Sequence, residues 1–164
     1  MQRQQVTLTG NTITSASADL RIGTSSVTST AFSDSHAGFS FKDIIPGGPA
    51  MPADGFTFYL KNAGSAPLVL KLAVGSVPTN TSNIDLSKVS VQITRVDGVT
   101  AGTSQTASVH SLIDPATKLA LTDTLTNNSV GTYKLRVLMA SDAFDGTNAT
   151  LGGVDLVFSG TAAN

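Results

Sequence analysis

Two histidines and eleven acidic residues, all of them aspartate, supply most of the acid–base and metal-binding chemistry open to this chain of 164 residues. His36 and His110 lie far apart in sequence, and neither has a second metal ligand at a useful spacing. Because the chain has no glutamate, it lacks the H-E-x-x-H sequence of zincin metalloproteases. Serine is abundant, but the nucleophile-elbow pattern G-x-S-x-G is missing. We therefore expect no enzymatic activity, and we expect both histidines to lie in solvated loops.

The segment SDAFDGTNATLGG, residues 141–153, holds the best arrangement of oxygen ligands in the sequence. Asp142, Asp145 and Asn148 offer side-chain oxygens, and calcium binds such oxygens in sets of about six to eight. The spacing differs from that of an EF-hand loop, and Asp-Gly and Asn are also ordinary turn residues. The sequence thus leaves a calcium site and a plain turn as alternatives. We favour the turn and expect no cofactor.

Composition limits the partners of the protein. Charged residues make up 13% of the chain, and its formal net charge is -1, so no basic excess favours a nucleic-acid partner. Three N-x-S/T sequons, at Asn80, Asn127 and Asn148, are no more than chance supplies in a Ser/Thr-rich chain, and glycosylation stays open.

No stretch approaches the roughly 20 apolar residues of a membrane helix. The start, MQRQQVTLTG, has no signal-peptide apolar region, so the protein is either cytosolic or a mature form without its signal.

Apolar and polar residues alternate at short intervals, which predicts β-strands. The alternating runs are residues 56–60, 68–74, 89–93, 133–139 and 154–158. Turn residues such as Pro46-Gly47-Gly48 and Asp97-Gly98 separate them. Many short strands with one apolar face each predict a single all-β domain, an antiparallel sandwich of two sheets. The predicted core residues include Phe58, Leu70, Val91, Leu135 and Leu156.

Residues 111–125, SLIDPATKLALTDTL, break this alternation. Pro115 suits the first turn of a helix, and Asp114 suits its N-cap. We therefore predict a short helix or a long crossover loop between the sheets in this segment.

The segment QQVTLT, residues 4–9, is a short alternating strand near the N-terminus. Gly10-Asn11 follows it and predicts a turn or hinge. Two interpretations are open. The segment is either the ordinary first strand of its own domain or a strand that fills the open edge of a neighbour's sheet.

Three segments, TITSASADLRIG, FSFKDIIPGG and FTFYLKNAGSAPLVLKL, follow one another in an order that resembles the TasA/camelysin family of secreted bacterial and archaeal proteins. The C-terminal segment GTYKLRVLMASDAFDGTNATLGGVDLVFSGTAA is similar to the closing pair of strands in that family. The likeness covers about residues 12–74 and 130–162. Gly48 stands where the family usually has Asp, and the family's closing Gln is missing.

This resemblance implies a jelly-roll sandwich, export through a cleaved signal peptide, and assembly into extracellular fibres of the biofilm-matrix or pilus kind. Subunits of the family join by donor-strand complementation, in which the N-terminal segment of one subunit completes the sheet of the next. For this chain the resemblance implies a donor segment of residues 1–11 and a jelly-roll domain of residues 12–164. The implied interface residues are Gln4, Gln5, Val6, Thr7, Leu8 and Thr9.

The function expected from the resemblance is that of a structural subunit in a head-to-tail homopolymer. The mature subunit would not insert into a membrane. The alternative is a monomeric cell-surface binding module with a jelly-roll fold and a carbohydrate or protein ligand.

Overall fold

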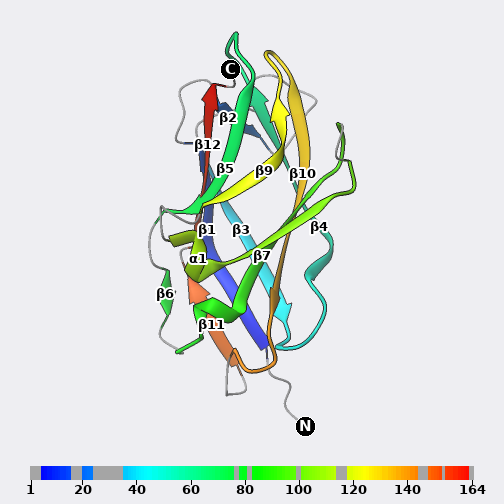
Figure 1. Ribbon diagram of the computed structural model, residues 1–164. Coiled ribbons are helices and arrows are strands. Elements are labelled where there is room, and N and C mark those ends of the chain that lie inside the picture. The colour runs from blue at the N-terminus through cyan, green and yellow to red at the C-terminus, as the bar shows by residue number, and fades with distance from the viewer. Residues whose placement is uncertain are drawn as a thin grey trace.

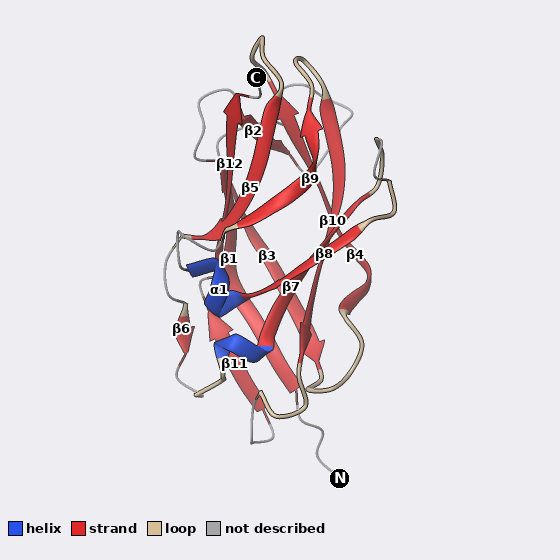
Figure 2. Ribbon diagram, viewed as in Figure 1, coloured by secondary structure: helices blue, strands red, loops and turns tan. Residues whose placement is uncertain are grey.

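The computed structural model describes residues 5–15, 20–23, 35–75, 78–80, 83–98, 101–113, 118–143, 148–152 and 154–162. These residues form two β-sheets that face each other (Figure 1). Strands dominate, and helical structure is confined to short pieces (Figure 2). The two-sheet all-β sandwich predicted from the sequence is confirmed, whereas its jelly-roll connectivity stays a prediction. Within the described ranges, no helix has both the length and the apolar character needed to cross a membrane.

The seven-stranded sheet contains both the first and the last strand of the chain. Its members are β1 (Gln5–Ser15), β3 (Ser35–Ile44), β5 (Leu68–Val74), β6 (Thr79–Asn80), β9 (Leu119–Leu125), β11 (Asn148–Gly152) and β12 (Asp155–Ala162). β1 runs antiparallel to β3 and parallel to β11 and β12. β5 pairs with β12 and β9, and β6 pairs with β11, all of them antiparallel.

The five-stranded sheet has the order β2-β4-β10-β7-β8 and is antiparallel throughout. Its members are β2 (Leu20–Gly23), β4 (Met51–Asn62), β7 (Val89–Arg95), β8 (Ser104–Ser108) and β10 (Val130–Met139). The pairing of β4 with β10 is irregular between Leu135 and Val137. Gly55 lies at this bulge with a φ of +75°, a conformation that glycine adopts far more readily than other residues.

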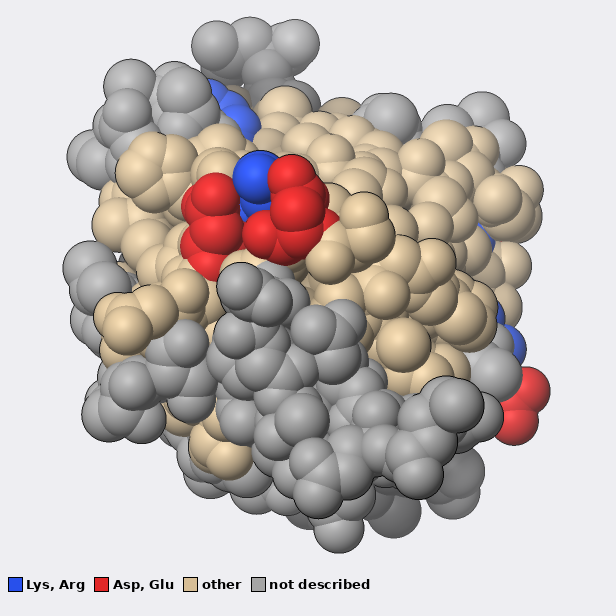
Figure 3. Space-filling view, turned by 90° about the horizontal axis from the view of Figure 1, so that it is seen from below, with Lys and Arg blue, Asp and Glu red and all other residues tan. Residues whose placement is uncertain are grey.

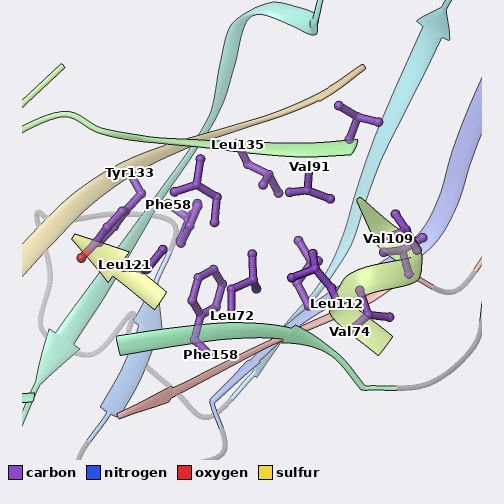
Figure 4. Close-up of a cluster of buried hydrophobic side chains, with 14 of the residues drawn as sticks. Phe58, Leu72, Val74, Val91, Val109, Leu112, Leu121, Tyr133, Leu135 and Phe158 are labelled. Carbon is purple, nitrogen blue, oxygen red and sulfur yellow. The ribbon is translucent and has the colours of Figure 1, made fainter. Parts of the chain in front are cut away.

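Apolar side chains from both sheets fill the space between them (Figure 4). The ring of Phe58 lies 5.4 Å from that of Tyr133 and 5.3 Å from that of Phe158, measured between centroids. The core residues predicted from alternation are each at most 2% exposed, namely Phe58, Leu70, Val91, Leu135 and Leu156. The strand register inferred from the sequence is therefore confirmed at these positions.

The segment 111–125 matches its prediction in part, because a short helix lies between β8 of the five-stranded sheet and β9 of the seven-stranded sheet. The helix α1 (Val109–Ile113) ends where a helix was expected to begin, and Leu119–Leu125 is strand β9. A proline disfavours helical conformation in the residue before it, so the Asp-Pro pair, which lies outside the described residues, favours a helix end there. Val109 and Leu112 of α1 are fully buried and complete the core at one side (Figure 4). A 3-10 turn, η2 (Leu86–Lys88), leads into β7.

Candidate functional site: the position of the first strand and a pocket at one pole

β1 occupies an internal position in the seven-stranded sheet. Residues 5–9 are in parallel register with residues 148–152 of β11, and residues 12–15 with residues 155–158 of β12. On its other side β1 runs antiparallel to β3 (Figure 1). The first strand of the chain thus lies between the third strand and the last two.

This placement differs from the expectation that the N-terminal strand lies outside its own sandwich. The pairing partners of residues 5–9 belong to the same chain, and an intramolecular partner carries no association cost. Gly10 and Asn11 form no turn, because β1 continues through both. A register shift against β3 between Leu8 and Asn11 marks the point at which the parallel partner changes from β11 to β12. Gln4 lies outside the described residues, and exchange of the strand between chains stays a prediction.

Positions 6 and 8 of β1 lie in register with buried positions on the neighbouring strands. Val6 is opposite Ile44, and Leu8 is in register with Leu151. Ile44 and Leu151 are both 0% exposed. The apolar positions that alternation identified in this strand therefore match core positions on both sides of it.

β1 is also the strand that connects β3 to its sheet. In the part of the chain that is described, β3 pairs with β1 and with no other strand. β1 has 11 residues and is about 36 Å long at roughly 3.3 Å per residue. If it left, the edges of β3 and of β11 and β12 would expose unpaired N–H and C=O groups along that length. This position must therefore be filled for the sheet to be stable.

Of the three calcium candidates, Asp142 is the one whose side chain is described, and it pairs with a lysine. Lys88 Nζ lies 2.6 Å from Asp142 Oδ2 and 3.8 Å from Asp85 Oδ2. The hydrogen bond between Lys88 and Asp142 lowers the pKa of that carboxyl and raises the pKa of the lysine. Asp145 lies outside the described residues, and Asn148 belongs to β11. Among the residues with described positions, no three His, Cys, Asp or Glu side chains gather to hold a metal ion.

Figure 3 shows a basic side chain flanked by acidic ones on the end of the molecule that faces the viewer. Lys88, Asp85 and Asp142 form an exposed, solvated ion-pair cluster, in which each carboxylate already faces the lysine.

The remaining residues singled out from the sequence are scattered. His110 is exposed on α1 and His36 lies in β3, so the prediction of loop histidines is wrong for both. Asn80 Nδ2 donates to Ile84 O at 2.7 Å, and Asn80 Oδ1 accepts from Ile84 N at 3.0 Å. This sequon asparagine therefore closes a turn of its own chain. Asn127 is exposed in the turn between β9 and β10.

A pocket of about 310 Å³ lies at the end of the sandwich where β12 ends. We call this end, formed by the β4–β5 turn, the β9–β10 turn and Ala162, the C-terminal pole (Figure 1). Arg95 and Asp97 line one side of the pocket, and Thr126 and Val130 line the other. The turn residues in the sequence predicted the turn at Asp97. They did not predict the pocket, because the two sides of the pocket are about 30 residues apart in sequence.

An ordered ion pair forms one wall of this pocket. Arg95 Nε donates to Asp97 Oδ1 at 2.8 Å, and the guanidinium carbon lies 5.0 Å from the centre of the Tyr133 ring. Partial burial acts to raise the pKa of Asp97, but hydrogen bonds from Arg95 and from the Thr132 backbone N–H outweigh it and lower that pKa. The wall is therefore polar and fixed in position, and its two charges offset each other.

Comparison of the chain with protein-family models and with curated proteins gives no match. The resemblance to the TasA/camelysin family thus stays a prediction from the segments quoted above. The functional proposals below depend on the position of β1, the pocket and the charges of the sheet faces.

Proposed function

We propose that this protein is a secreted, non-enzymatic subunit of an extracellular filament, built as a jelly-roll sandwich whose first strand passes from one chain to the next. The internal position of β1 carries this proposal. β1 is the first strand among the described residues, yet it pairs with strands on both of its sides. The position can be filled by the strand of the same chain or by the equivalent strand of a neighbour.

The energetics allow either state. A buried Val or Leu contributes about 1.5–3 kcal/mol, and each ladder hydrogen bond about 0.5–1.5 kcal/mol. The strand gains these terms equally within its own chain and in a neighbour, whereas association costs about 4–15 kcal/mol. The balance between monomer and polymer therefore depends on protein concentration and on further contacts between the bodies of the subunits.

The short connection to β2 limits how two exchanging chains can meet. Residues 16–19 join Ser15 to Leu20, and five Cα-to-Cα steps span at most about 18 Å. Leu20 pairs with Asn62, which lies at the C-terminal pole. Ser15 pairs with Phe158, which lies four residues before the end of β12. A β1 strand that enters a neighbouring chain would place its Ser15 beside the Phe158 of that neighbour. Exchanging subunits therefore contact each other near this pole, either in an open series or in a closed pair.

The first test removes the strand and returns it as a peptide. A chain that begins at residue 16, refolded with a synthetic peptide of residues 1–15, should give a folded 1:1 complex that does not polymerise. The parent chain should form filaments that are visible by electron microscopy under the same conditions. Filaments from the truncated chain would contradict the proposal, and so would a parent that forms only closed pairs by analytical ultracentrifugation.

The second test uses two double substitutions with equal charge. Val6→Asp with Leu8→Asp places two carboxylates at positions in register with buried residues, where unpaired charges are strongly disfavoured. Thr7→Asp with Thr9→Asp places two carboxylates at the positions that alternate with residues 6 and 8. Thr7 is in register with the exposed Thr150. The first variant should abolish filaments and the second should retain them. Equal behaviour of the two variants would contradict the register on which the proposal depends.

A monomeric binding module is the second candidate function, and the pocket at the C-terminal pole favours it. Its volume of about 310 Å³ is at the small end of the range for ligand pockets, roughly 300–1,000 Å³. The paired charges of Arg95 and Asp97 and the hydroxyl of Thr126 suit a small neutral polar ligand such as a sugar. A parent chain that remains monomeric but binds such a ligand would favour this alternative.

A further inference from the structure

The outward face of the five-stranded sheet gathers four of the ten basic residues of the chain. Arg21 lies on β2, Lys61 on β4, and Lys134 and Arg136 on β10. Each of the four is partly buried and stands between two buried neighbours in its strand. Because strand residues alternate between faces, all four lie on the solvent side of the sheet. We call this surface the basic face.

The basic face brings like charges together as two pairs. Arg21 is directly opposite Lys61 in the antiparallel register of β2 and β4. Lys134 and Arg136 are two residues apart on the same face of β10. Side chains at such neighbouring positions lie close enough for one anionic group to contact both members of a pair.

The two pairs lie too far apart for one small anion to contact both. Lys61 and Thr57 are four residues apart on β4, which is about 13 Å at roughly 3.3 Å per residue. Thr57 is directly opposite Lys134 on β10. A partner that engages both pairs must therefore be extended along the strands and carry more than one negative charge.

The surroundings of these cations are rich in neutral hydrogen-bonding groups. Lys134 is flanked in register by Thr57 and Thr94, and Arg136 has Gln92 beside it on β7. Hydroxyl and amide groups of this kind both donate and accept hydrogen bonds, as the hydroxyls of a sugar chain require.

Single-stranded nucleic acids, by contrast, are bound on rows of aromatic side chains that stack with the bases. At the outward positions of this sheet that the structure describes, Tyr59 is the one aromatic residue. The face therefore suits an extended acidic polymer made of sugars better than one made of bases.

We propose that the basic face binds a linear anionic polysaccharide, whose carboxylates lie on the Arg21–Lys61 and Lys134–Arg136 pairs. This binding does not depend on exchange of β1 and holds for a monomer as well as for a filament. The net charge of -1 for the whole chain did not indicate this site, because the four cations gather on one face.

The test titrates the full chain with polygalacturonate by isothermal calorimetry at low ionic strength. The fully methyl-esterified polymer, which lacks the charge, and single-stranded poly-dT are the comparison ligands. We expect binding of polygalacturonate that weakens as salt is added, no binding of the esterified polymer, and weaker binding of poly-dT. Absence of polygalacturonate binding, or tighter binding of poly-dT, would overturn the proposal.

Matched variants test whether the basic face itself is responsible. Lys134→Gln with Arg136→Gln should weaken polygalacturonate binding by about tenfold or more, a difference of roughly 1.4 kcal/mol. Lys71→Gln with Lys118→Gln makes the same change of net charge at two exposed lysines outside this sheet and should leave binding nearly unchanged. Circular dichroism melts establish that both variants fold. Equal loss of binding in the two variants would overturn the proposal, because net charge alone would then explain binding.

Discussion

The side-chain amide of Asn62 donates a hydrogen bond to the backbone carbonyl of Leu125, with Nδ2 and O 2.9 Å apart, and so joins β4 of one sheet to the end of β9 in the other. The same nitrogen donates to Ala66 O at 2.7 Å, and Asn62 Oδ1 accepts from Gly64 N at 2.9 Å. Asn62 is 0% exposed, so these bonds replace the water that its amide would otherwise bind. One side chain thus closes the β4–β5 turn and fastens the two sheets together at the C-terminal pole.

Replacing Asn62 should destabilise the protein strongly. Asn62→Ala leaves the buried Leu125 carbonyl and the part-buried Gly64 N–H and Ala66 carbonyl without their partner, and an unsatisfied buried group costs about 1–3 kcal/mol. We expect a fall of roughly 2–4 kcal/mol in the free energy of unfolding, measured by urea denaturation. Asn127→Ala, at an exposed turn position, is the control and should change it by less than about 0.5 kcal/mol. Equal effects would show that the Asn62 bonds contribute nothing specific.

Two glycines with similar φ angles should respond differently to alanine. Gly55 has a φ of +75°, and a Cβ there would lie 2.8 Å from Lys134 Cβ. Gly102 has a φ of +86°, but a Cβ there would meet nothing within 4 Å. Gly102→Ala should therefore cost only the backbone strain, about 1 kcal/mol, whereas Gly55→Ala adds a steric clash and should cost about 2–4 kcal/mol. Thermal melts of the two variants give the comparison, and a larger effect at Gly102 would contradict the placement of the β4 bulge.

The pair of Arg95 and Asp97 should make stability depend on acidic pH. The hydrogen bonds of Asp97 lower its pKa below the ordinary value of 3.8, so its contribution is present above that value and is lost as pH falls through the lowered pKa. Asp97→Asn should therefore be less stable than the parent near pH 7 and show a smaller fall in the free energy of unfolding on acidification.

Asp142→Asn is the comparison for this pH effect. The Asp142 side chain is 68% exposed, and its hydrogen bond from Lys88 also lowers its pKa. Because exposed pairs are screened, this variant should change the acid profile less than Asp97→Asn, and least at high salt. A larger effect of Asp142→Asn would contradict the importance assigned to the partly buried pair.

The aromatic cluster at the centre of the core should be the most sensitive to truncation. Phe58→Ala removes the contacts with Tyr133 and Phe158 and leaves a cavity, which costs about 3–5 kcal/mol. Val130→Ala is the apolar control, because Val130 is 36% exposed, and it should cost less than about 0.5 kcal/mol. Chemical denaturation measures both, and a small effect at Phe58 would mean that the core relaxes around the cavity.

The sequence by itself determined the strands that carry regular alternation and the face that each of them buries. Leu70, Val91 and Leu135 could be assigned to the core because a strand places alternate residues on opposite faces, whatever its neighbours are. Local rules were weaker where alternation failed. The polar strand β8 gave no apolar pattern, and the Asp-Pro pair before β9 suggested a helix start where α1 instead ends.

Tertiary structure alone decided which strands are neighbours and which side chains meet. The sequence identified the first strand, but its place between β3 and the last two strands depends on pairing across more than 130 residues. The tertiary structure also decides three other contacts: the hydrogen bond from Asn62 to Leu125, the Arg95–Asp97 wall of the pocket, and the pairing of Lys61 with Arg21. Backbone pairing is available to any strand, so a residue pattern fixes the face of a strand but not its partner.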